Sequence, residues 1–237
     1  MTVTVALAYF LQQHVLRLAP MKLIDTFHVE HRLIDRALGS LRRYVDGLVD
    51  GSSNPQDGRL FGTFFIDFAG HFHHDREERV LFEALVTEAD LPRDRGPVQA
   101  LTRQHALMEA WMAELAPLLL ECPPLSDADR LRVAALATRY SHALWRHIDA
   151  ENSVLYPEST ERLAQSGIHE LPDRSMSEAE AAARAAVEPL LDRYPPIEDA
   201  VLARGDGCFM CPAYGESCDG LEAEWWSELE WDEFRSR

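Results

Sequence analysis

Apolar residues recur at helical spacing along four stretches of the chain, and each stretch carries a histidine on its apolar side. At about 100° per residue, positions three and four apart share one face of an α-helix. The central histidines of the four stripes are His31, His73, His105 and His147. The pattern predicts four helices, each of which buries one imidazole.

Turn-forming residues separate the first two predicted helices. The first helix is expected over residues 20–49 and the second over 59–89. Between them, residues 50–58 are rich in Asp, Gly, Ser and Pro, which favours a loop. Residues 91–97 contain two prolines and a glycine and should end the second helix.

The third and fourth helices also carry boundary signals. The third should run to about Cys122, with a kink near its end at Pro117. Ser126 and Asp129 have the spacing of a capping box for the fourth helix, which should end or bend at Pro157. Short connections between long helices predict an all-α fold, an antiparallel up-down-up-down four-helix bundle.

The bundle should occupy residues 21–165, with an extension at each end. Residues 1–20 lack the basic start of a secretory signal, and Met21 is a plausible alternative start of translation. The C-terminal extension, residues 166–237, should contain an alanine-rich helix that begins at Ser177, followed by a cysteine cluster and an acidic, tryptophan-rich end.

The second and fourth predicted helices carry the same motif, a histidine followed four residues later by a glutamate. The motifs are His73 with Glu77 and His147 with Glu151, and the offset between them is constant, since 147 − 73 and 151 − 77 are both 74. The same offset joins His31 to His105 and Asp35 to Glu109. The chain therefore contains an internal repeat.

The spacing within the motif has a chemical consequence. A step of four residues places the imidazole and the carboxylate on one face of a helix, one turn apart, and here that face is apolar. A single buried histidine is most simply a core residue with a hydrogen bond. Four of them, with two carboxylates, would be costly to bury uncompensated, and a bound cation is the common solution.

These residues resemble the hemerythrin-like (HHE cation-binding) domain over about residues 21–165. The resemblance is carried by Glu30-His31, by His73-x3-Glu77 followed by Leu81-Phe82, by Gln104-His105, and by His147-x3-Glu151 followed by Leu155-Tyr156-Pro157. It implies a centre of two non-haem iron ions, joined by an oxo or hydroxo group. Its terminal ligands would be the four histidines, and Glu77 and Glu151 would bridge the ions.

Such a centre would keep an open coordination position for nitric oxide, dioxygen or peroxide. Oxygen-carrying hemerythrins have a second histidine where this chain has Glu109, and an aspartate five residues after the fourth-helix histidine. Here Glu151 follows at four residues. The chain thus looks more like the members linked to nitric oxide and to repair of iron centres.

Neighbouring polar residues are candidates for supporting roles. Asp35 and Glu109 should face inward and could accept the ligands' imidazole protons or relay protons, although an arginine partner is an equal alternative. His28 lies near His31 and is a possible extra ligand.

Three other histidines are less favoured as ligands. His74 and Glu78 also have the four-residue spacing, but they lie roughly 100° and 140° from the stripe in an α-helix. His71 and His142 fall off the buried faces and should be solvated.

The tail has its own candidate site at Cys208, Cys211 and Cys218. The cysteines could bind zinc or an iron–sulfur cluster or cycle as a dithiol, but three thiolates do not complete a tetrahedral site, and free thiols are the alternative. The tryptophan-rich end could dock on the bundle or on a protein partner.

Composition narrows the function. The net charge of −17 argues against binding to nucleic acid or to anionic membranes, and no apolar run is long enough for a membrane span. A cytoplasmic protein is expected. The favoured hypothesis is binding or conversion of a small oxidant. The alternative is a sensor of oxygen, iron or redox state that signals through the tail.

Overall fold

The computed structural model of the chain describes residues 21–120 and 125–197. Within these ranges the regular secondary structure is all helical, without a strand. The elements are α2 (Lys22–Asp50), α3 (Asp57–Thr63), η1 (Phe64–His74), η2 (Glu77–Phe82), α4 (Glu83–Glu88), α5 (Gly96–Leu120), α6 (Asp127–Ala150), η3 (Glu151–Leu155), α7 (Tyr156–Gln165) and α8 (Glu178–Arg193). Residues 1–20 and the cysteines Cys208, Cys211 and Cys218 lie outside the described ranges.

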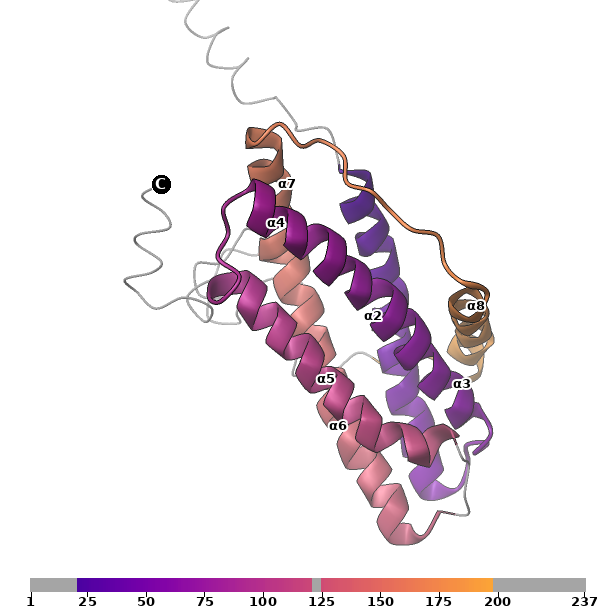
Figure 1. Cartoon of the computed structure of the whole chain (residues 1–237). Helices are drawn as coiled ribbons and strands as arrows, with labels where there is room; N and C mark the ends of the chain where they lie inside the picture. The colour runs from indigo at the N-terminus through magenta and orange to yellow at the C-terminus, as the bar shows by residue number, and fades with distance from the viewer. Residues whose placement is uncertain (1–20, 121–124, 198–237) are drawn as a thin grey trace, which may run out of the picture.

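Four long helical segments run side by side in the described part of the chain (Figure 1). They are α2, the run from α3 to α4, α5, and the run from α6 to α7, which agrees with the four helices expected from the apolar stripes. None of these helices is apolar over enough of its length to cross a membrane.

Serine caps begin two of the helices, as the sequence predicts. The amide of Asp129 donates to Ser126 Oγ over 3.2 Å, and the amide of Glu180 donates to Ser177 Oγ over 3.3 Å. In both cases the acidic residue also accepts from the serine's own amide, which completes a capping box.

The second segment differs from its expected form. The helical backbone covers the expected region, but Phe64–His74 and Glu77–Phe82 are π-helical, with hydrogen bonds from residue i to i+5. The sequence pattern predicted an α-helix throughout. A π turn contains an extra residue, so the angle between consecutive side chains is smaller than in an α-helix.

Two prolines have different effects on their helices. Pro117 lies inside α5, and Figure 1 shows that helix changing direction near its end, as predicted. Pro157 does not end the fourth segment, which continues as α7 to Gln165. Pro157 lies in the first turn of α7, directly after the π-helical Glu151–Leu155, where its missing N–H is tolerated.

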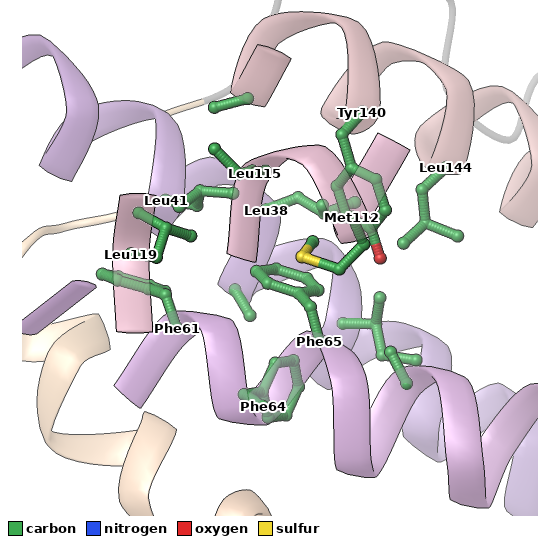
Figure 2. Close-up of a cluster of buried hydrophobic side chains, with 14 of the residues drawn as sticks. Leu38, Leu41, Phe61, Phe64, Phe65, Met112, Leu115, Leu119, Tyr140 and Leu144 are labelled. Atoms are coloured by element: carbon green, nitrogen blue, oxygen red, sulfur yellow. The ribbon is translucent and has the colours of Figure 1, made fainter. Parts of the chain in front are cut away.

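Buried apolar side chains form two clusters along the helices. The larger contains residues between 34 and 72, 108 and 119, and 133 and 148, together with side chains of α8. Figure 2 shows part of it, with Phe65, Met112 and Tyr140 pointing toward one another from three helices. The smaller contains residues between 21 and 27, 81 and 101, and 155 and 163. The histidines and glutamates of the four stripes lie between the two.

The helix α8 packs against the bundle. Ser40 Oγ on α2 donates to the carbonyl oxygen of Tyr194 over 2.7 Å, and the Tyr194 hydroxyl donates to Asp57 Oδ2 over 2.7 Å. Arg193 also pairs with Asp57. These bonds fix the end of α8 to α2 and α3.

Candidate metal centre

The structure brings the six predicted ligand residues together in the interior. Each is at most 4% exposed to solvent. They are His31 on α2, His73 at the end of η1, Glu77 at the start of η2, His105 on α5, His147 on α6 and Glu151 at the start of η3.

The Glu77 carboxylate lies between two pairs of histidines. Its Oε1 is 3.3 Å from His73 Nε2 and 3.7 Å from His31 Nε2. Its other oxygen, Oε2, is 3.5 Å from His105 Nε2. One carboxylate therefore reaches both sides of the site.

Glu151 does the same from the opposite helix. Its Oε2 is 3.1 Å from His147 Nε2 and 3.4 Å from His31 Nε2, and its Oε1 is 4.0 Å from His105 Nε2. Two ligand atoms at right angles on a metal with bonds of about 2.1 Å lie roughly 3 Å apart. The spacing suits the ligands of a bound metal ion.

Several nitrogen and oxygen atoms of these groups are buried without a hydrogen bond, as expected of atoms that bind a metal. Within the part of the chain that the structure describes, His73 Nε2, Glu77 Oε2 and both carboxylate oxygens of Glu151 are buried without a hydrogen-bond partner. Leaving such groups unsatisfied costs about 1–3 kcal/mol each, and more for charged groups. A metal would satisfy all of them, and imidazole with carboxylate is a ligand set that suits iron.

Burial favours the neutral, metal-binding form of three imidazoles in the site, those of His73, His74 and His105. It lowers the pKa of His73 to about 3, and it lowers the pKa values of His74 and His105 well below the usual histidine range. Burial and the nearby Glu151 raise the pKa of Glu77. Burial would raise the pKa of Glu151 as well, but the neighbouring His147 and His31 outweigh it, and the net shift is downward.

The outer nitrogen of each ligand histidine is held by an acceptor. In the first half of the repeat, His31 Nδ1 is 2.9 Å from Asn152 Oδ1, and His73 Nδ1 is 2.7 Å from Glu30 Oε2. The carboxylate of Glu30 is held in turn by Arg76, at 2.7 and 2.9 Å. Such acceptors fix the ring orientation and the tautomer that binds metal.

The second half uses the equivalent positions. His105 Nδ1 is 2.8 Å from Glu78 Oε1, and His147 Nδ1 is 2.9 Å from Gln104 Oε1. Glu30 and Gln104 are partners in the internal repeat, and so are Glu78 and Asn152. The sequence-based prediction missed this role for all four residues, although each directly adjoins a ligand and follows the repeat.

The residues predicted for that role lie elsewhere. Asp35 is half-buried and Glu109 is exposed, and the acceptors of the four Nδ1 atoms are other residues. His28 is half-buried, and its Nδ1 lies 2.9 Å from the same Asn152 oxygen that holds His31. His28 therefore contacts the surroundings of the site.

His74 is more central than an α-helical projection indicates. It is 8% exposed, its ring stacks on His105 at 4.1 Å between centroids, and its Nε2 has no hydrogen-bond partner among the described residues. A ligand atom of His74 groups with those of Glu77, His105 and His147 within 4.8 Å. The π-helical turns of η1 explain why the α-helical projection placed it off the buried face.

The two histidines expected in solvent differ from each other. His71 is exposed, as predicted. His142 is half-buried, and its Nε2 lies 3.2 Å from Arg42 on α2. The prediction for His142 was therefore wrong, because α2 covers that side of α6.

The two halves of the site differ in the aromatic residue that covers them, because Tyr156 has a hydroxyl and its repeat partner has none. Its buried hydroxyl donates to Glu77 and lies 3.3 Å from His31 Nε2, while its ring stacks on His31. The equivalent residue, Phe82, stacks on His105 at 5.8 Å and has no hydroxyl. The His31 half therefore gains a phenol, and the His105 half gains the imidazole of His74.

Comparison with known families agrees with this geometry. A family model described as the Hemerythrin HHE cation binding domain matches residues 22–159, which is more than half of the chain. Among curated proteins and among solved structures, nothing matches the chain.

Proposed function

Because the chain belongs to the hemerythrin HHE cation-binding domain family, we propose that it is a non-haem di-iron protein that binds or converts a small oxidant: nitric oxide, dioxygen or peroxide. The observation that carries the proposal is the position of Glu77 and Glu151, each within 4.0 Å of nitrogen atoms from both histidine pairs. Two reduced iron ions bound there would supply electrons and an open position for the oxidant.

In this proposal the ligand residues have separate roles. His31, His73, His105 and His147 are terminal ligands, and Glu77 and Glu151 bridge the ions. The four helical segments adopt the antiparallel up-down-up-down order of a bundle, and the protein works in the cytoplasm. Glu109 occupies the position of the second third-helix histidine of the oxygen carriers, which favours nitric oxide or peroxide over oxygen transport.

Metal analysis with optical spectroscopy tests the proposal. The purified chain, reconstituted with ferrous iron without oxygen and then exposed to air, should hold two irons and show an oxo-bridge absorption band. Glu151→Gln should lose at least one iron, while Glu161→Gln, an exposed glutamate on α7, should keep both. A wild-type chain that holds no iron, or a single iron without the band, overturns the proposal.

A second candidate function is supported by one set of contacts. The ligand His73 bonds to Glu30, Glu30 bonds to Arg76, and Arg76 Nε donates to Asp173 Oδ1 over 2.8 Å. Asp173 lies in the segment that leads to α8. A change of charge at the metal would reach this segment, as a sensor that signals through its C-terminal part requires.

Turnover separates the two functions. Repeated consumption of nitric oxide or peroxide by the reduced protein supports conversion. A single stoichiometric spectral change, accompanied by altered hydrogen exchange over residues 168–177, supports the sensor.

A further inference from the structure

A cavity of about 730 Å³, broadly open to solvent on one side, lies between η1 and α5, and its inner end reaches the candidate metal centre. His74 and His105 form that end, and Phe65, Met112 and Tyr140 line the apolar part. A diatomic ligand needs a small fraction of this volume. Cavities of this size are typical of sites for organic molecules.

The internal repeat shows how the chain makes this space. Three small residues that line the cavity have large counterparts at the equivalent repeat positions, on the face between α2 and α6. The pairs are Gly70 with Leu144, Thr102 with His28, and Ala106 with Arg32. Leu144 is fully buried. The smaller side chains at these three positions leave room for the cavity between η1 and α5.

The cavity also determines which half of the centre a ligand meets. It opens on His105 and His74, which belong to the half completed by His147. In the other half, the Tyr156 ring covers His31 at 5.3 Å and His28 lies edge-on against Tyr156 at 5.2 Å. A ligand from the cavity reaches the His105 half first.

The lining restricts the chemistry of the ligand. Phe65, Met112 and Tyr140 are each at most 4% exposed, and the Phe65 and Tyr140 rings pack edge-on at 5.4 Å (Figure 2). Burial raises the pKa of Tyr140, so its phenol stays neutral. This part of the cavity suits an apolar body.

The rim of the cavity disfavours anions. Asp75, Glu78 and Glu109 lie on the rim, and Arg79, which pairs with Asp75, is on the rim with them. Acidic groups outnumber the arginine there, and the whole chain carries a net charge of −17. A neutral ligand is therefore favoured over superoxide, nitrite or a carboxylate.

We propose that the cavity is a substrate site for a neutral organic hydroperoxide, with its apolar body on Phe65, Met112 and Tyr140 and its oxygen atoms toward His74 and His105. This inference rests on the proposed function for its chemistry. Two reduced iron ions held by the histidine and glutamate ligands would supply the two electrons that this reaction needs. With two protons, they would convert ROOH, whose O–O bond breaks, to ROH and water.

Binding to the metal-free chain tests the site independently of iron. The probe is 2-phenyl-2-propanol, the alcohol that corresponds to cumene hydroperoxide, measured by ligand-observed NMR and titration calorimetry. Ala106→Trp should fill the cavity and weaken binding at least tenfold. Ala110→Trp, one turn away on the exposed side of α5 and outside the cavity lining, is the matched control and should bind as wild type.

Gly70→Leu restores the residue of the repeat partner and should have the same effect as Ala106→Trp. A Cβ atom at Gly70 meets its nearest neighbour, the Phe65 carbonyl oxygen, at an ordinary 3.5 Å, so the backbone accommodates it. Wild type that does not bind the alcohol, or cavity variants that bind it as wild type does, overturns the inference.

The iron-loaded protein gives the second measurement. Ala106→Trp should slow oxidation of the reduced centre by cumene hydroperoxide at least tenfold more than it slows oxidation by hydrogen peroxide, whereas Ala110→Trp, outside the lining, should leave both rates as in wild type. Equal effects on both peroxides would refute organic selectivity and leave the proposed function intact. Failure to load iron would refute the proposed function, while alcohol binding would still decide whether the cavity is a site.

Discussion

At the scale of single residues, the two halves of the repeat hold the outer nitrogen of a ligand histidine with acceptors of different charge. Glu30 holds His73 and is itself held by the fully buried Arg76. At the equivalent positions in the second half of the repeat, Gln104 replaces Glu30 and Ala150 replaces Arg76. A buried carboxylate needs a cation. Where the arginine is absent, a neutral amide holds the histidine instead.

This correlation predicts the effect of Glu30→Gln. Arg76 would lose the buried carboxylate to which its Nη1 donates and keep Asp173, which is 42% exposed. Removing one member of a buried ion pair costs about 3 kcal/mol or more. The free energy of unfolding of the metal-free chain should fall by about this amount in urea denaturation.

Glu78→Gln is the matched control for that change. Glu78 also accepts from a ligand histidine, but its side chain is 38% exposed and the neighbouring Arg79 is solvated. Its replacement should change the stability of the metal-free chain by less than about 1 kcal/mol. Equal losses for the two variants would show that Arg76 does not depend on Glu30.

At the scale of helices, the positions of the ligands could be predicted from sequence better than the helix type. The apolar stripes and the internal repeat indicated the six converging residues, because a period near four survives a local change of helix. The π-helical turns could not be predicted, because they depend on packing between helices. For this reason His74 was predicted to lie off the buried face. For the same reason the fourth helix was expected to end or bend at Pro157, whereas it continues to Gln165. The acceptors Glu78 and Asn152 were missed for a related reason, since the expected geometry aimed them away from the site.

The docking of α8 depends on a close approach at Gly39. A Cβ atom at Gly39 would lie 2.5 Å from the Ile197 carbonyl oxygen, and the Ile197 amide donates to the Gly39 carbonyl oxygen over 3.2 Å. Gly39→Ala should push this segment away and destabilise the chain by about 1–3 kcal/mol. Gly70→Ala, also in a helix but without such a contact, should be neutral or stabilising by up to about 1 kcal/mol. Thermal unfolding of both variants provides the comparison, and a stabilised Gly39→Ala chain would contradict the docking.

At the scale of the whole molecule, a layer of buried imidazoles lies between two apolar clusters and makes stability depend on pH. An unfolded histidine takes up a proton below pH 6.5, but burial lowers the pKa of folded His73, His74 and His105. The unfolded state then binds more protons, so these residues stabilise the fold above pH 6.5 and destabilise it as pH falls. Glu77 has the opposite effect on stability, because its pKa is raised in the folded chain and the folded state therefore binds one proton that the unfolded state releases.

On unfolding between pH 6.5 and 5, the three histidines take up three protons and Glu77 releases one. The chain therefore takes up about two protons in total. Half-buried His28 and Glu78 are shifted in opposite directions and offset each other. The free energy of unfolding of the metal-free chain should therefore fall by up to about 2.7 kcal/mol per pH unit in this range.

His74→Ile, which restores the repeat partner's residue, should reduce this slope of the free energy of unfolding against pH by about 1.4 kcal/mol per pH unit. Urea titrations at pH 7, 6 and 5 measure both slopes. A stability that stays constant or rises toward pH 5 would mean that water reaches these imidazoles and that they become protonated within the folded chain. They would then not form the dry, neutral set of ligands that the proposed two-metal centre requires.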